Sequence, residues 1–116
     1  MRVLACATLI LAAACGADSG STTPPVSHNK SVDVFTLNSV FSPSFVQIAQ
    51  GDTIRFNIVP ASNGEGHDVT FDPTPGAPAS IKVTQNGVIP RVFSTKGTFH
   101  YNCFVHPGMT GDIVVQ

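Results

Sequence analysis

One short stretch of the chain gathers three side chains that can bind a soft metal ion. Residues 97–111 read GTFHYNCFVHPGMTG, in which His106 follows Cys103 by three residues and Met109 follows His106 by three more. A thiolate, an imidazole and a thioether spaced in this way can turn towards one ion. The chain has only two methionines, so the presence of one of them in this short stretch suggests a specific role.

These side chains must be positioned by a β-rich framework. No segment of the chain has a sustained helical period, whereas short runs of apolar and β-branched residues alternate with turn residues such as Gly51-Asp52, Asn63-Gly64 and Asn86-Gly87. We therefore predict an all-β, Greek-key antiparallel sandwich or barrel of about eight strands. The predicted strands are 32–37, 45–50, 53–59, 67–72, 80–84, 91–93, 98–103 and 112–116.

Strand alternation decides which side chains of the segment 98–103 face inwards. Phe99, Tyr101 and Cys103 fall on one face, and His100 falls on the other. Because two aromatic residues share the face of the cysteine, we expect Cys103 to end a buried strand at the rim of the sandwich. His100 is then a solvent-facing strand residue and a poor ligand candidate.

A further ligand has to come from elsewhere in the chain. His28 lies in a polar segment before the first strand, so His67, which opens the strand 67–72 after a glycine-rich turn, is the remaining histidine. Alone, a histidine at this place would more often be structural. With Cys103, His106 and Met109, it completes a set of two imidazoles, one thiolate and one thioether.

This donor set discriminates between metals. A thioether is a poor ligand for zinc, calcium or magnesium, whereas two histidines and a cysteine with a weak methionine are typical of blue copper electron-transfer sites. We therefore predict one type 1 copper ion as the cofactor.

The amino terminus predicts export. Residues 1–14 contain a single positive charge followed by an apolar run too short to span a bilayer, as in a secretory signal peptide. The sequence LAAAC that ends at Cys15 resembles a bacterial lipobox, so Cys15 is a candidate for lipidation; ordinary cleavage after Ala14 is the alternative. Residues 15–30 are small and polar, as expected of a flexible tether, which leaves 31–116 as the folded domain. We expect the mature protein in the periplasm or cell envelope, with the lipid on Cys15 as its only membrane attachment.

Export makes the state of Cys103 informative. Cys6 leaves with the signal peptide and lipidation blocks Cys15, so Cys103 has no disulfide partner in an oxidising compartment. A free cysteine can be a small buried apolar residue, but that role does not account for the histidine and methionine beside it.

The charge of the chain argues against nucleic-acid binding. Once Arg2 leaves with the signal peptide, five basic and seven acidic residues remain, and neither kind forms a continuous run.

At the level of families, the chain resembles the cupredoxins, small blue copper proteins of the plastocyanin and amicyanin kind. The resemblance covers nearly the whole domain and is most specific in residues 97–115, where the spacing of the ligand loop is the short form typical of amicyanins. It implies that His67, Cys103 and His106 are strong ligands and that Met109 is a weak axial one. It also implies one-electron transfer with redox partners such as a cytochrome or a membrane oxidase, by a monomer.

The resemblance carries two further implications. Many family members have asparagine after the first ligand histidine, where this chain has Asp68, and that asparagine ties the two ligand loops together. An ionised aspartate can only accept hydrogen bonds, so the effect on the site stays open. The ring edge of the second histidine is expected to reach the surface within an apolar patch, for which Phe104, Val105 and Pro107 are candidates.

Two other classes of function are an enzyme and a copper carrier. Multicopper oxidases and copper nitrite reductases place a histidine beside the copper cysteine, whereas Asn102 and Phe104 flank Cys103 here. A binuclear copper centre would need a second cysteine in the loop, and the loop has none. A Cys103 nucleophile with His106 as base is possible in principle, but nothing suggests an oxyanion hole, so we do not expect an enzyme. A periplasmic copper carrier or storage module with the same ligands is the main alternative.

Overall fold

The computed structural model describes residues 29–116, and these form nine β-strands. The predicted signal peptide, Cys15, His28 and all but the last two residues of the predicted tether lie outside the described residues. No helix in the described part of the chain is long and apolar enough to cross a membrane. The strands are β1 (Ser31–Leu37), β2 (Val40–Ser42), β3 (Phe45–Ile48), β4 (Thr53–Ile58), β5 (His67–Phe71), β6 (Ile81–Thr84), β7 (Gly87–Val92), β8 (Gly97–Asn102) and β9 (Thr110–Val115).

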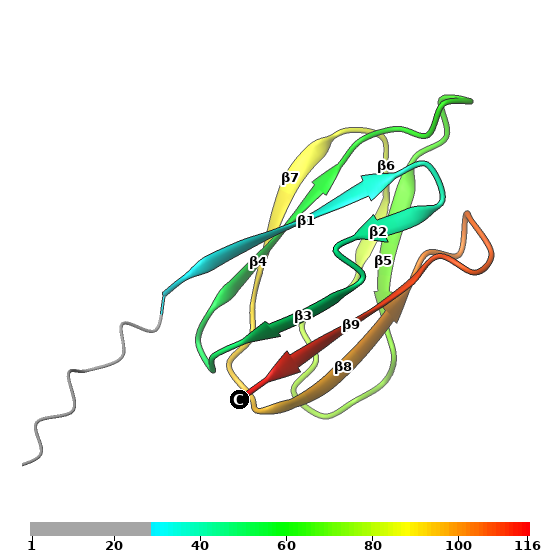
Figure 1. The fold of residues 1–116 in the computed structure, drawn as a ribbon. Coiled ribbons are helices and arrows are strands. Elements are labelled where there is room, and N and C mark those ends of the chain that lie inside the picture. The colour runs from blue at the N-terminus through cyan, green and yellow to red at the C-terminus, as the bar shows by residue number, and fades with distance from the viewer. Residues whose placement is uncertain (1–28) are drawn as a thin grey trace, which may run out of the picture.

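The strands form two sheets that pack face to face (Figure 1). One sheet has the order β2-β1-β4-β7, and the other has the order β3-β9-β8-β5-β6. The predicted all-β sandwich is confirmed, but it is mixed rather than wholly antiparallel, because β1 pairs with β4 and β3 pairs with β9 in parallel. Parallel strand pairs are joined by long crossover connections, so the pairing depends on contacts between residues far apart in the sequence. The alternation of residues within one strand does not predict such contacts.

Most strand ends lie within two residues of the prediction, and two strands differ by more. The three-residue β2 was not predicted, because so short a segment has little periodicity to recognise. β7 begins at Gly87, four residues before the predicted start at Arg91, and it includes Pro90. Proline cannot donate to a sheet, but β7 is an edge strand and tolerates it.

The core lies between the sheets and is rich in aromatic rings. Tyr101 is fully buried at its centre, with ring centroids 4.8 Å from Phe41, 5.5 Å from Phe56 and 5.6 Å from Phe71. The predicted inward face of β8 is confirmed, since Phe99, Tyr101 and Cys103 are all buried. Edge-to-face rings of this kind add to the stability that burial alone provides.

Two loops project from one end of the sandwich. The β8–β9 loop carries Cys103 to Met109, and the β4–β5 loop leads into His67; both lie at the end away from the carboxyl terminus (Figure 1). At the start of the described chain, the Lys30 amide already donates to Asp52 Oδ1 at 2.9 Å, so the last predicted tether residue is attached to the domain.

Candidate metal centre

His67, Cys103 and His106 meet at the loop end of the sandwich. The Nδ1 atoms of His67 and His106 lie 3.9 and 3.7 Å from Cys103 Sγ, and the two imidazole rings have centroids 4.5 Å apart. One potential ligand atom from each residue lies within 4.8 Å of the other two. The structure therefore brings together the three predicted strong ligands from two separate parts of the chain.

Each of these side chains is positioned by a strand end or a closed loop. His67 is the first residue of β5, and Cys103 directly follows the last residue of β8. The Cys103 amide donates to the Met109 carbonyl at 2.9 Å, and the Met109 amide donates to the His106 carbonyl at 3.1 Å. Gly108 has a φ of 85°, a conformation that glycine adopts without strain. Backbone bonds at both ends thus fix the loop that carries His106.

Burial and donor chemistry fit a soft metal ion at this place. His67 and Cys103 are buried, and His106 is only 9% exposed. Burial lowers the pKa of His67, and the neighbouring His106 lowers it further, so the neutral form that binds metals is favoured. Burial raises the pKa of the Cys103 thiol, so a metal ion that binds here must displace a proton.

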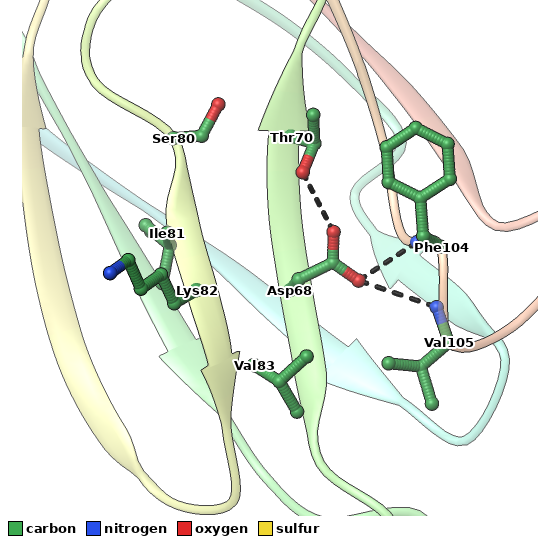
Figure 2. A pocket seen from close by; sticks show the side chains of 8 residues that line it. All are labelled: Asp68, Thr70, Ser80, Ile81, Lys82, Val83, Phe104 and Val105. Carbon is green, nitrogen blue, oxygen red and sulfur yellow. Dashed lines mark hydrogen bonds between the residues drawn. The ribbon is translucent and has the colours of Figure 1, made fainter.

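Asp68 ties the ligand loop to β5. Its Oδ1 accepts hydrogen bonds from the amides of Phe104 at 2.8 Å and Val105 at 3.3 Å, and its Oδ2 accepts one from Thr70 Oγ1 at 2.8 Å (Figure 2). Burial alone would raise the pKa of Asp68, but these hydrogen bonds hold it below its ordinary value. The donors come from the backbone of the ligand loop, so an acceptor-only side chain makes the connection between the two ligand segments.

Met109 is the last residue of the loop and is buried. Its side chain is 1% exposed and belongs to the hydrophobic core, while its backbone closes the loop. His100, which we did not expect to be a ligand, lies on the outer face of β8, where its Nδ1 is 2.8 Å from Asp112 Oδ1.

The sequence did not predict that Glu65 lies beside His106. Its Oε2 lies 3.5 Å from His106 Nε2, at the side of the ring away from Cys103, and His106 is 9% exposed. Glu65 is the only glutamate in the chain, and this is the one signal in the sequence that could have drawn attention to it.

Comparison with solved structures identifies the fold. A pseudoazurin from Methylobacterium extorquens AM1 matches with 28% identity over 74% of this chain and 75% of its own, with a TM-score of 0.59. A plastocyanin from Dryopteris crassirhizoma matches with 23% identity over 73% of this chain and 100% of its own, with a TM-score of 0.62. A reduced Cu(I) form of a mutant amicyanin matches with 21% identity over 74% of this chain and 82% of its own, with a TM-score of 0.60.

A copper-containing nitrite reductase from Thermus scotoductus also matches, but only 22% of that longer chain is covered. No family model and no curated protein matches the sequence. The shared architecture of these solved structures is the cupredoxin sandwich, and the cluster of His67, Cys103 and His106 fits the ligand set of a type 1 copper site.

Proposed function

We propose that this chain, a member of the cupredoxin family, is an exported type 1 copper protein that carries single electrons between redox partners. The observation that carries the proposal is the buried cluster in which two Nδ1 atoms lie 3.9 Å or less from the sulfur of Cys103. One thiolate and two imidazoles of this kind favour copper over harder metal ions.

In this proposal His67, Cys103 and His106 are the strong copper ligands and Met109 is the weak axial ligand. Bound copper would supply the Cu(I)/Cu(II) couple. The residues around it keep the donors in place: β5 and the end of β8 fix His67 and Cys103, and Asp68 fastens the loop between Cys103 and His106. Donors held by rigid strands need little movement when the charge at the site changes, which favours rapid electron transfer.

The surface beside Cys103 supports brief contacts with partner proteins. Phe104 is 74% exposed, and an open groove of about 480 Å³ runs from it to Ile81 and Val83 of β6 (Figure 2). Val105 lines the same groove, and Pro107 is exposed next to His106. A mainly apolar surface of this kind suits weak, transient encounters rather than a stable complex. A cytochrome or a membrane oxidase is the proposed partner class, on the analogy with the family.

We also propose that Cys15 carries a lipid that holds the protein at a membrane of the cell envelope. The lipobox-like sequence before Cys15 supports this part of the proposal. Mass spectrometry of the mature protein should find an acylated Cys15 at the amino terminus. A mature protein with an unmodified amino terminus would exclude the anchor.

A visible spectrum of the copper-loaded protein tests the electron-carrier proposal. We expect an intense copper–thiolate band that bleaches on reduction and returns on oxidation, with copper retained in both states. A colourless Cu(II) adduct, or rapid loss of Cu(I) to a mild chelator, would instead indicate the alternative function of a copper carrier or storage module.

The residues beside the cysteine argue against an enzyme. The pseudoazurin, plastocyanin and amicyanin that share this fold are electron carriers, and the nitrite reductase match covers only part of that enzyme. Asn102 and Phe104 flank Cys103, so no histidine is in place to lead electrons to a second copper.

A further inference from the structure

The ring of His106 has one nitrogen facing Cys103 and the other facing Glu65. His106 Nδ1 is 3.7 Å from Cys103 Sγ, while Nε2 is buried and makes no hydrogen bond within the described residues. The carboxylate oxygen Oε2 of Glu65 lies 3.5 Å from that Nε2. This separation of carboxylate and imidazole is longer than a tight hydrogen bond.

The β4–β5 loop holds Glu65 at this place. Asn63 Nδ2 donates to Glu65 Oε2 at 2.7 Å, and the Glu65 amide donates back to Asn63 Oδ1 at 3.1 Å. The Ala61 amide donates to the Glu65 carbonyl at 2.9 Å. On the other side, Gly66 packs against β6, because a Cβ atom there would lie 2.7 Å from the Thr84 carbonyl oxygen. The carboxylate is 55% exposed, yet both its backbone and its side chain are held in place.

We propose that Glu65 is a positioning residue for copper, which holds the hydrogen of His106 on Nε2 and so leaves Nδ1 free to bind the metal. A neutral imidazole carries one N–H, and an ionised carboxylate can only accept a hydrogen bond. The N–H therefore belongs on the nitrogen that faces Glu65. Carboxylates that accept from ligand histidines fix the ring and raise the basicity of the nitrogen that binds the metal.

The proposal rests on the proposed copper site and adds an electrostatic consequence. A negative charge beside a ligand histidine stabilises the more highly charged Cu(II) relative to Cu(I). Glu65 should therefore lower the reduction potential. His67 offers an internal comparison, because no acidic side chain in the described chain forms an ion pair with its imidazole.

The first test needs no metal. Imidazole ¹⁵N chemical shifts of the copper-free full chain at about pH 8, where free imidazoles are neutral, should show His106 with its hydrogen on Nε2. In Glu65→Ala the shifts of His106 should move towards a mixture of the two tautomers, while the tautomer of His67 stays unchanged. A wild-type His106 with its hydrogen on Nδ1, or an unchanged tautomer in Glu65→Ala, would overturn the proposal.

The second test is the reduction potential of the copper-loaded protein. Glu65→Gln keeps the size of the side chain and removes its charge, and we expect the affinity for Cu(II) relative to Cu(I) to fall roughly tenfold, which raises the potential by about 59 mV. Glu65→Asp keeps the charge and should restore most of the wild-type value. Asn63→Ala, which removes the clamp on the carboxylate, should give a smaller rise than Glu65→Gln.

Asp72→Asn is the matched control for charge. Asp72 follows β5 and lies five residues from His67 along an extended chain, or about 17 Å away. A rise in Glu65→Gln no larger than in Asp72→Asn would overturn the role of Glu65 while leaving the copper site standing. If the wild-type protein bound no copper, the proposed function would fail, and the ¹⁵N shifts would still decide the tautomer.

Discussion

The aromatic core and the metal-binding end of this sandwich are built from the same face of β8, but they leave different groups unpaired. In the core, Tyr101 is surrounded by phenylalanine rings, and its hydroxyl makes no hydrogen bond within the described residues. Two residues along, Cys103 faces two imidazole nitrogens instead of aromatic carbon. The core packs apolar side chains against one another and needs no ligand. The loop end instead brings together donor atoms that a metal ion can bind. Stability and copper chemistry should therefore respond to different substitutions.

Cys103→Ser should give the largest effect at the metal-binding end. Loss of the thiolate should abolish the visible band entirely, because a hydroxyl cannot replace a soft ligand for copper. The copper-free variant should keep a cooperative thermal transition near that of the wild type, since the aromatic core is untouched. A retained blue colour would contradict the assignment of Cys103, and an unfolded variant would contradict the separation of core and site.

Phe56→Ala should give the largest effect in the core. Phe56 is fully buried against Phe71 and Tyr101, so its truncation should lower the free energy of unfolding by about 3–5 kcal/mol. Denaturant titration of the copper-free protein measures this loss. The folded fraction should keep the wild-type wavelength of the copper band, and a shifted band would show that the two regions are coupled.

Asp68→Ala should affect the connection between the two regions. It leaves the amides of Phe104 and Val105 without their acceptor, which should cost about 1–3 kcal/mol and loosen the ligand loop. Hydrogen exchange at these two amides should become faster, while exchange in the core strands stays slow. Asp68→Asn keeps a carbonyl acceptor and is the matched control. Unchanged exchange in Asp68→Ala would show that other contacts hold the loop.

Met109→Gln changes a residue that belongs to both regions. Its side chain is part of the core, and it is also the proposed axial ligand. The variant should retain copper with a lower reduction potential, because an amide oxygen is a harder donor than a thioether and favours Cu(II). Voltammetry measures the shift. An unchanged potential would indicate that Met109 is a packing residue only.

Asp33→Asn should have the smallest effect, because the ion pair that Asp33 forms with Arg55 is exposed to solvent. The hydrogen bond from Arg55 holds the pKa of Asp33 below its ordinary value, so the pair stabilises the fold above about pH 4 and loses this contribution as the pH falls through the lowered pKa. The small difference in melting temperature between variant and wild type should be present at neutral pH and absent in strong acid. A difference that persists in acid would exclude the ion pair as its source.

The sequence predicted the parts of the site that follow from local spacing. Cys103, His106 and Met109 lie in one loop, and strand alternation placed Cys103 on the core face of β8, as the structure confirms. His67 was reached by elimination among four histidines. The ligand roles of these residues remain proposals, although the structure brings three of them together.

Features that depend on distant contacts were not predictable. The parallel pairing of β3 with β9 joins segments more than sixty residues apart, and β2 is too short to show a period. The sequence left open how Asp68 affects the tie to the ligand loop, because it does not show that the donors are backbone amides, for which a carboxylate suffices. The position of Glu65 over His106 needs the β4–β5 and β8–β9 loops to be placed side by side, which no motif specifies.

Copper-edge X-ray absorption of the loaded full-length protein tests the central claim most directly. The account predicts one copper ion per chain, with one sulfur and two imidazole nitrogens as strong ligands in both oxidation states, and loss of that sulfur in Cys103→Ser. A copper ion without a sulfur ligand, or one whose nitrogen ligands persist when His67 and His106 are both replaced, would contradict it.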